Sequence, residues 1–342
     1  MSDTAAPLPA WVYENKQGTV IGPVVLFSVL AIIAVILRFK CRSLARANIG
    51  PDDWLILAAL PVAVADAVVV AYSTKDGLGR HQQLVSKPAL REGGEIFFTI
   101  QILWAISSSL VKLSILFFYQ RVFGILRYVR FIAWFLIALV IIWMIGVTIA
   151  HALECTPIAK SWDVSLPGHC LDTVSLYMVG SISDVVMDFL ILILPLPAIA
   201  RLQMPMSRKI ELVLIFALGG LTCVLSLVRF LGAKKVIYDK EDITWISSFP
   251  LVWAAAEPCL GTVCACLPML QPLMQGLKER VMKMSSTATS LTPSSKNVSN
   301  KARSSWKPRF PNREQNVHIQ IPDWSEESLQ ETLRNRGWAG EV

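Results

Sequence analysis

The stretch SISDVVMDFLILILPLPA, residues 181–198, contains two carboxylic acids in an otherwise almost wholly apolar run. Asp184 and Asp188 are four residues apart, so a helix places both on one face, about 6 Å apart along its axis. The apolar run extends over the length of about 20 residues that a helix needs to cross a bilayer. An ionisable group at that depth is costly and usually faces the interior of a helix bundle. The stretch therefore predicts a membrane-embedded bundle with a polar interior.

The composition of the whole chain indicates the same class of protein. Of its 342 residues, 54% are hydrophobic and 17% are charged, whereas a soluble domain carries about a quarter charged residues. The net charge of +7 is typical of basic inner loops in a membrane protein. We therefore expect the lipid bilayer as a partner and expect no nucleic acid.

Seven segments are long and apolar enough to span a membrane as helices, the form in which a segment satisfies its own backbone hydrogen bonds in lipid. They lie near residues 19–37, 54–72, 96–119, 131–151, 175–199, 210–232 and 245–273. We predict an all-α protein with a seven-transmembrane helix bundle in residues 19–275. A short extracellular N-terminus, 1–18, precedes it, and a mostly disordered cytoplasmic tail, 276–342, Ser/Thr-rich and basic, follows it.

The distribution of Lys and Arg among the loops predicts the orientation. Three short connections are dense in these residues: Arg38, Lys40, Arg42 and Arg46; Arg121, Arg127 and Arg130; Arg201, Arg208 and Lys209. The alternate loops, 73–95, 152–174 and 233–244, are longer and of mixed sign. We therefore place the N-terminus outside and the C-terminus inside, in a multi-pass protein of the plasma membrane or an endomembrane.

Six ionisable residues lie within the predicted spans and are candidates for a ligand site or a polar core. They are Asp66, Lys112, Asp184, Asp188, Arg229 and Glu257. Counted by depth, they suggest an outer polar cavity closed by Arg229, with Asp188, Glu257 and Lys112 beneath it. The alternative is that they form ion pairs that fix the helix register, and the sequence leaves both interpretations open. We assign no metal site and no catalytic residue.

Three further features concern the two ends of the bundle. Cys155 and Cys170 both lie in the predicted outer loop 152–174, where an oxidising environment favours a disulfide between them. Arg121, in YQRVF at the inner end of the third segment, is a candidate contact for a transducer or an anchor at the membrane interface. The seventh segment contains no lysine for a retinal Schiff base, and no cofactor is predicted.

Several motifs occur in an order that resembles a known family. They are DDWLILAA (52–59), GLGRH (77–81), KLSILFFYQRVF (112–123), ECTPIAKSWD (154–163) and GHCLD (168–172), followed by the opening stretch. Together they resemble the fungal rhodopsin-like seven-transmembrane integral membrane proteins, which include Pth-type receptor-like proteins and satratoxin-type membrane proteins of mycotoxin clusters. The resemblance covers about residues 20–275 and implies a seven-helix fold without implying retinal.

Three functions are compatible with these features. The first is a receptor-like sensor, in which an unknown small-molecule ligand acts on the inner loops and tail, with a G protein as a possible partner. The second is a membrane protein of a fungal secondary-metabolite (mycotoxin) cluster, either an accessory protein or a cyclase that uses embedded carboxylic acids. The third is a transporter, for which the sequence shows no internal repeat. We favour the receptor-like function and do not favour enzymatic activity.

Overall fold

The computed structural model describes residues 9–44, 46, 48–163, 165–197, 206–238 and 242–289. Within these, residues 206–218, 237–238 and 270–289 are described by their backbone only. Residues 1–8 of the predicted N-terminal segment and 290–342 of the predicted tail lie outside the described part, as does Arg201. The helix bundle lies in a compact unit that spans Met1–Thr287.

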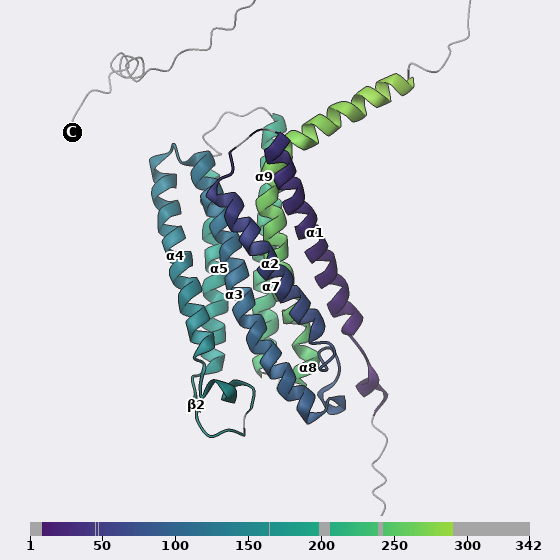
Figure 1. The fold of residues 1–342 in the computed structure, drawn as a ribbon, viewed down its shortest axis with the longest axis vertical. Coiled ribbons are helices and arrows are strands. Elements are labelled where there is room, and N and C mark those ends of the chain that lie inside the picture. The colour runs from purple at the N-terminus through teal and green to yellow at the C-terminus, as the bar shows by residue number, and fades with distance from the viewer. Residues whose placement is uncertain are drawn as a thin grey trace, which may run out of the picture. The chain divides into compact units, whose positions relative to one another are not determined.

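The described chain contains seven long helices, and the prediction of an all-α fold is confirmed (Figure 1). The short elements are β1 (Cys155–Thr156), β2 (His169–Cys170), α8 (Ile243–Ile246) and the 3-10 segments η1 (Ala10–Tyr13), η2 (Gln82–Leu84) and η3 (Ile158–Ser161). The long helices are α1 (Gln17–Leu44), α2 (Pro51–Tyr72), α3 (Lys87–Phe123), α4 (Arg127–Ala152), α5 (Thr173–Ile193), α7 (Met206–Tyr238) and α9 (Ser248–Thr289).

Six helical stretches of the described chain are long and apolar enough to cross a membrane, which confirms the prediction of a multi-pass membrane protein. They are Ala10–Leu44, Pro51–Tyr72, Lys87–Phe123, Arg127–Ala152, Thr173–Ile193 and Ile243–Met269. Helix α7 is not among these six, but it packs against α5 and is the seventh long helix of the bundle. It contributes both polar and apolar side chains to the interior, among them Arg229, Ser226 and Leu225.

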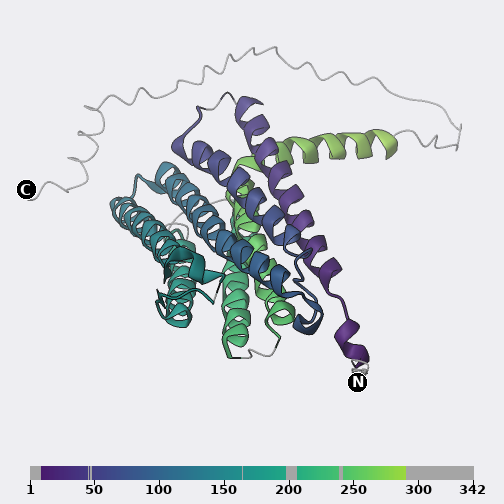
Figure 2. The same cartoon turned by 60° about the horizontal axis from the view of Figure 1, so that its bottom comes forward.

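Both views place α4 and α1 on opposite sides of the bundle, with α9 between them (Figures 1 and 2). The largest apolar cluster joins α3, α4 and α5 and includes Leu116, Val140 and Met187. Large apolar side chains on the outward faces remain exposed, among them Val29 of α1 and Phe135 of α4. An exposed apolar surface of this extent suits lipid rather than water as the surrounding solvent.

Several helices are longer than the hydrophobic runs predicted, and the loops are correspondingly shorter. Helix α1 ends at Leu44 instead of near residue 37, because Arg38 and Arg42 are buried in ion pairs and do not form a solvated basic loop. Helix α3 begins at Lys87 instead of near residue 96, because the Ser86 hydroxyl caps it and Pro88 suits its first turn. Hydropathy alone therefore misplaces these helix ends, because a capping hydrogen bond and ion pairs determine where the two helices begin and end.

The end of the bundle that carries β1, β2 and α8 is called the outer end below, following the predicted orientation. Here the turn after α2 adopts positive φ at Gly77 and Gly79, which favours glycine. The Gly79 amide donates to the carbonyl of Thr244, 3.1 Å away, and His81 stacks on Trp245 with ring centroids 4.0 Å apart. These contacts join the turn after α2 to α8.

Candidate functional site

Lys112 of α3 lies at the centre of a buried ionic cluster. Its Nζ atom is 2.8 Å from Asp184 Oδ1 and 3.1 Å from Asp188 Oδ1, both on α5. It also lies 3.9 Å from Glu257 Oε1 of α9. Asp184 and Asp188 are four residues apart and therefore lie on one face of α5. Both carboxylates contact the same ammonium group. Three helices are held together by this side chain.

Arg229 of α7 completes the cluster from the outer side. Its Nη2 atom is 3.0 Å from Asp184 Oδ2, and its Nε atom is 2.9 Å from Glu257 Oε2. The guanidinium carbon lies 4.0 Å from the ring centroid of Trp104, a cation–π contact. The guanidinium is therefore paired with two carboxylates and covered by an indole, and it links α7 to α5, α9 and α3.

Hydroxyl groups saturate the remaining oxygens of the cluster. Ser108 donates to Glu257 Oε1 at 3.2 Å and accepts from Lys112 Nζ at 2.7 Å. Ser226 of α7 donates to Asp188 Oδ2 at 2.6 Å. Buried charges are tolerated when they are paired and fully hydrogen-bonded in this way.

The three carboxylates of the cluster could also be considered as metal ligands. One oxygen from each of Asp184, Asp188 and Glu257 lies within 4.8 Å of the other two. However, Lys112 Nζ lies close to all three and already supplies a positive charge. The trio has the chemistry of an ion-pair network around an ammonium group, and we assign it no metal.

Asp66 of α2 takes no part in the ion pairs of this cluster, unlike the other five residues singled out in the sequence. The residue is fully buried, and neither carboxylate oxygen has a hydrogen-bond partner among the residues that the structure describes. It makes none of the ion pairs described, although its carboxylate is near enough to Glu257 for the two groups to interact electrostatically. The set suggested by depth in the membrane, Arg229 with Asp188, Glu257 and Lys112, did not include Asp66, and all four of its members belong to the cluster.

A small cavity opens on the outer side of Arg229. It is lined by Phe97, Ile100, Gln101, Trp104, His151, Tyr177, Gly180, Ser181, Arg229, Leu251 and Ala254. Its volume is about 20 Å³, which holds about one water molecule. We call this space, with its lining residues, the vestibule. Arg229 belongs both to the vestibule wall and to the ionic cluster, so it connects the two.

Two polar atoms of vestibule residues lack partners. Trp104 Nε1 and His151 Nδ1 are buried and have no hydrogen bond to any described residue. The carboxylate of Glu154 is 3.9 Å from His151 Nδ1, which is too far for a hydrogen bond. Buried polar groups normally find partners, so two such atoms at one cavity indicate a place where a further molecule could bind.

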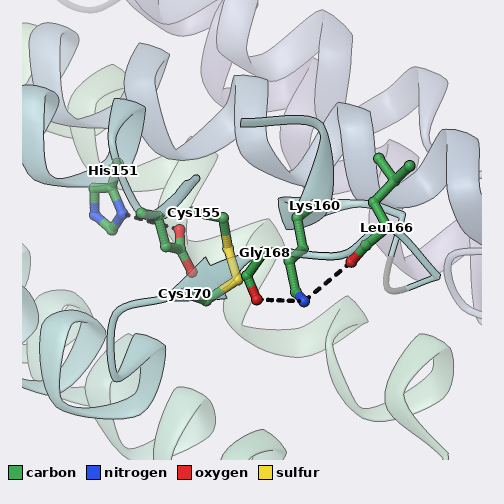
Figure 3. Close-up of a disulfide and its surroundings, with 7 residues drawn as sticks. His151, Cys155, Lys160, Leu166, Gly168 and Cys170 are labelled. Atoms are coloured by element: carbon green, nitrogen blue, oxygen red, sulfur yellow. Dashed lines mark hydrogen bonds and ion pairs between the residues drawn. A yellow bond between two sulfur atoms is a disulfide. The ribbon is translucent and has the colours of Figure 1, made fainter. Parts of the chain in front are cut away.

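A hairpin between α4 and α5 lies at the outer end of the bundle (Figure 1). Its strands β1 and β2 pair in antiparallel fashion, and the Sγ atoms of Cys155 and Cys170 are bonded at 2.05 Å. Lys160 Nζ donates to the carbonyls of Leu166 and Gly168 at 3.0 and 2.8 Å. The disulfide and the ammonium group close the hairpin at two points along its length (Figure 3).

The same hairpin is tied to the outer end of α3. Trp162 packs on Phe98, with ring centroids 5.7 Å apart, and Asp163 pairs with Arg91 at 3.2 Å. A Cβ on Gly94 would lie 2.9 Å from the Cβ of Trp162, so only glycine permits this approach. Hydrogen bonds from Ser165 and the charge of Arg91 lower the pKa of Asp163 below its ordinary value. The ion pair is therefore formed at neutral pH.

A second ionic cluster lies at the inner end and was not expected as a site. Arg38 contacts Asp52 and Asp53 at 2.5 and 2.8 Å, and Arg42 contacts the same two carboxylates at 2.7 and 2.8 Å. Arg38 also donates to the carbonyl of Ala265 in α9 at 2.6 Å. The cluster thus joins α1 and α2 to α9.

Arg121, the candidate for a transducer contact, lies at the edge of this inner cluster. Its Nη1 atom is 3.4 Å from Asp52 Oδ1, and its Nη2 atom donates to the carbonyl of Asn48 at 3.0 Å. The side chain is 37% exposed. It is thus held by the bundle on one side and accessible on the other.

The inner cluster could have been predicted from residue spacing, although a reading by hydropathy alone assigns these residues to a loop. Arg38 and Arg42 are four residues apart, which puts them on one face of a continuing helix. Asp52 and Asp53 lie in the first turn of α2, where carboxylates favour the helix N-terminus. No comparable signal singled out Trp104 or His151, because an isolated tryptophan or histidine in an apolar run is ordinary.

A bundle of apolar helices around buried ion pairs, with a vestibule at one end, defines a polytopic membrane protein of rhodopsin-like architecture. Comparison with known families agrees, because residues 37–276 match the model of the fungal rhodopsin domain. The chain belongs to this family. No solved structure matches the chain.

Three relatives illustrate the range of the family. The polyenoic acids biosynthesis gene cluster protein Ba17b of Metarhizium anisopliae is 27% identical, over 74% of this chain and 72% of that protein. The Receptor GIN3 of Arthrobotrys oligospora is 26% identical, over 92% and 77%. A SAT4 family membrane protein of Emericella nidulans is 33% identical, over 60% of this chain and 52% of the relative, so about half of that relative is matched.

Proposed function

We propose that this protein is a receptor-like sensor that binds a small molecule in the vestibule and signals through its inner end. The proposal rests on one observation: Arg229 lines the vestibule and also forms ion pairs with Asp184 and Glu257. A molecule that enters the vestibule contacts the residue that connects α7 to α5 and α9. Ligand contact and helix packing are therefore coupled through one side chain.

The small size of the vestibule indicates that ligand binding would move the surrounding helices apart. A cavity of about 20 Å³ holds about one water molecule, so an organic ligand fits only an arrangement in which the surrounding helices have separated. A ligand shifts such an equilibrium by its differential affinity for the two arrangements. We expect the ligand to stabilise the expanded arrangement and the ion pairs of Arg229 to favour the closed one.

The inner end offers a surface on which the change is detected. Arg121 connects α3 to the inner cluster and leaves part of its guanidinium accessible, and we propose a G protein as the partner that contacts it. The similarity to a relative named as a receptor, which extends over 92% of this chain, supports the proposal.

Affinity capture of the tagged protein from its own membranes tests this function. A Gα subunit that is recovered with the protein, and released by a non-hydrolysable GTP analogue, is the expected result. Arg121→Ala should reduce the recovery, whereas Arg127→Ala, which removes an exposed arginine in the same region, should not. Absence of Gα, under conditions that capture a control receptor, would contradict the proposal.

The names of several relatives favour a second candidate, a membrane protein of a secondary-metabolite cluster. In a cyclase, the embedded acids would protonate a substrate. The acids of the ionic cluster are, however, paired with Lys112 or Arg229, and none of them lines the vestibule, which favours the receptor. Metabolite profiles of Asp184→Asn and Asp188→Asn strains, at matched protein level, test this alternative, because loss of a product would support the cyclase.

A further inference from the structure

We infer that the vestibule takes an uncharged, mainly apolar molecule that carries a hydrogen-bond-acceptor oxygen, such as a ketone or lactone carbonyl. This inference rests on the proposed function, since it defines the chemical class of the ligand for the same site. Four features of the vestibule carry it: an unpartnered donor, the charge balance of the wall, the apolar lining and an open space at one glycine.

The unpartnered donor is the indole N–H of Trp104. The side chain lines the vestibule and is 6% exposed, and Nε1 has no partner in the described part of the chain. One face of the ring is covered by Arg229, and the ring stands nearly perpendicular to that of Trp143, with centroids 6.0 Å apart. An indole nitrogen donates and does not accept, so the group that satisfies it is an acceptor. A carbonyl oxygen in the vestibule would satisfy this requirement.

The charges of the wall disfavour an anionic ligand, although an arginine is present. The positive charge of Arg229 is already compensated by Asp184 and Glu257. With Lys112 and Asp188 included, the cluster has two cationic groups and three carboxylates. Another carboxylate placed against Arg229 would therefore meet negative charges behind it in a medium of low dielectric constant. A neutral acceptor avoids this repulsion.

The rest of the lining is mainly apolar and aromatic. Phe97, Ile100, Tyr177, Leu251 and Ala254 surround the polar atoms. Sites for small molecules typically combine such a lining with a few polar groups that fix the orientation of the ligand. His151 Nδ1, the second unpartnered atom, offers a further polar contact at another wall.

Gly180 of α5 lies where the closed vestibule has open space. It lines the vestibule, and a Cβ added to it would have no atom within 4 Å. The first carbon of a side chain at this position would therefore meet open space instead of a neighbouring helix. A leucine here begins in that space and, because it is larger than the closed vestibule, occupies the room that a ligand would need.

The experiment uses the full chain in lipid nanodiscs and three probes with the same ring. Cyclohexanone supplies an acceptor, cyclohexane supplies none, and cyclohexanecarboxylate supplies a negative charge. A ligand that binds only the folded state raises the midpoint of thermal unfolding. We expect cyclohexanone to raise it most at equal concentration in the membrane, and cyclohexanecarboxylate to raise it least.

Two variants with matched controls locate the effect. Trp104→Phe removes the donor and keeps a ring, and it should weaken the apparent affinity for cyclohexanone about three- to tenfold; Trp253→Phe, outside the lining, should not. Gly180→Leu should abolish the stabilisation. Gly146→Leu on α4, where a Cβ also has no atom within 4 Å, should leave it unchanged.

Several outcomes overturn the inference. They are equal stabilisation by all three probes, stronger stabilisation by the carboxylate, no stabilisation by any probe, or an unchanged effect in Gly180→Leu. These results are distinguishable from failure of the proposed function. Cyclohexanone binding with no recovered Gα contradicts only the signalling role, whereas recovered Gα with a preference for the carboxylate contradicts only the ligand class.

Discussion

Lys112 is the single residue on which the buried polar centre depends most. Its ammonium group lies within 4 Å of carboxylates from two helices, and its side chain is only 6% exposed. Removing one member of a buried ion pair leaves the other members uncompensated, which costs far more than the loss of an exposed pair. Replacing this lysine should therefore cause a large decrease in the free energy of unfolding.

Lys112→Met should lower the free energy of unfolding by roughly 3–5 kcal/mol, because three carboxylates then lack their shared counter-charge. Chemical denaturation of the purified protein in detergent measures the change. Lys75→Met is the matched control, since Lys75 is exposed and contacts only the ring of Tyr72 among the interactions described, and it should change stability by less than about 1 kcal/mol.

A double substitution distinguishes the loss of charge from the loss of side-chain packing. Lys112→Met combined with Asp184→Asn removes one positive and one negative charge together. We expect the double variant to be more stable than Lys112→Met alone, as a double-mutant cycle would show. Equal or lower stability of the double variant would mean that packing, and not charge balance, explains the effect.

At the scale of elements, the junction of α1 and α2 is held by paired arginines and aspartates. Arg38 is fully buried and reaches Asp52, Asp53 and the carbonyl of Ala265. The contact with α9 adds a third helix to the junction. The inner end of the bundle is thus joined through polar contacts, whereas the interface of α3 with α4 is mainly apolar.

Arg38→Met should destabilise the protein by roughly 3–5 kcal/mol, because Asp52 and Asp53 would lose a buried partner. Lys40→Met on the same helix is the control, since Lys40 is exposed. The two variants have the same change in formal charge, so a difference in their melting temperatures reports burial. Equal melting temperatures would contradict the buried junction.

The start of α5 gives a pH-dependent prediction. Asp172 caps the helix, and hydrogen bonds from the Ser175 hydroxyl, the Ser175 amide and the Val174 amide lower its pKa below the ordinary value of 3.8. A lowered pKa in the folded state means that the cap stabilises above pH 3.8 and that the contribution is lost as pH falls through the lowered pKa.

Hydrogen exchange of the first amides of α5 measures this effect. Their protection should decrease as the pH falls below 3.8, after correction for the intrinsic exchange rate. Asp172→Asn retains a capping side chain without a titrating group, so its protection should not depend on pH in this range. If both proteins lose protection in parallel, the titration of Asp172 is not the cause.

At the scale of the whole molecule, the orientation in the membrane is a prediction that the bundle makes easy to test. The five cysteines outside the disulfide are buried, so background labelling by a thiol reagent should be low. Gln83 and Lys40 are exposed and lie at opposite ends of the bundle. They offer one reporter position at each end.

Gln83→Cys should react with a membrane-impermeant maleimide in intact cells if the protein lies in the plasma membrane, and in sealed vesicles of the corresponding orientation otherwise. Lys40→Cys should react only after the membrane is permeabilised. The reverse pattern would mean that the density of Lys and Arg in the loops misassigned the two sides. In that case the vestibule would face the cytoplasm.

Much of the fold could be predicted from the sequence because partition into lipid is a local property of each segment. The predicted spans all overlap the long helices, and the embedded charged residues stand out from their apolar neighbours. The ends of the helices were less predictable. Arg38 and Arg42 look like a solvated loop by composition, and their burial depends on Asp52 and Asp53 across a turn.

A polytopic helical membrane protein with ionisable residues in its interior could be predicted from the residues alone, because apolar length and charge position are properties of each segment. Which charges meet depends on how the helices pack. Lys112 and Asp184 are 72 residues apart, and their contact depends on the rotation and packing of α3 and α5. Asp66, on α2, makes none of these ion pairs, and packing at the outer end brings Trp104 and Arg229 together in the lining of the vestibule.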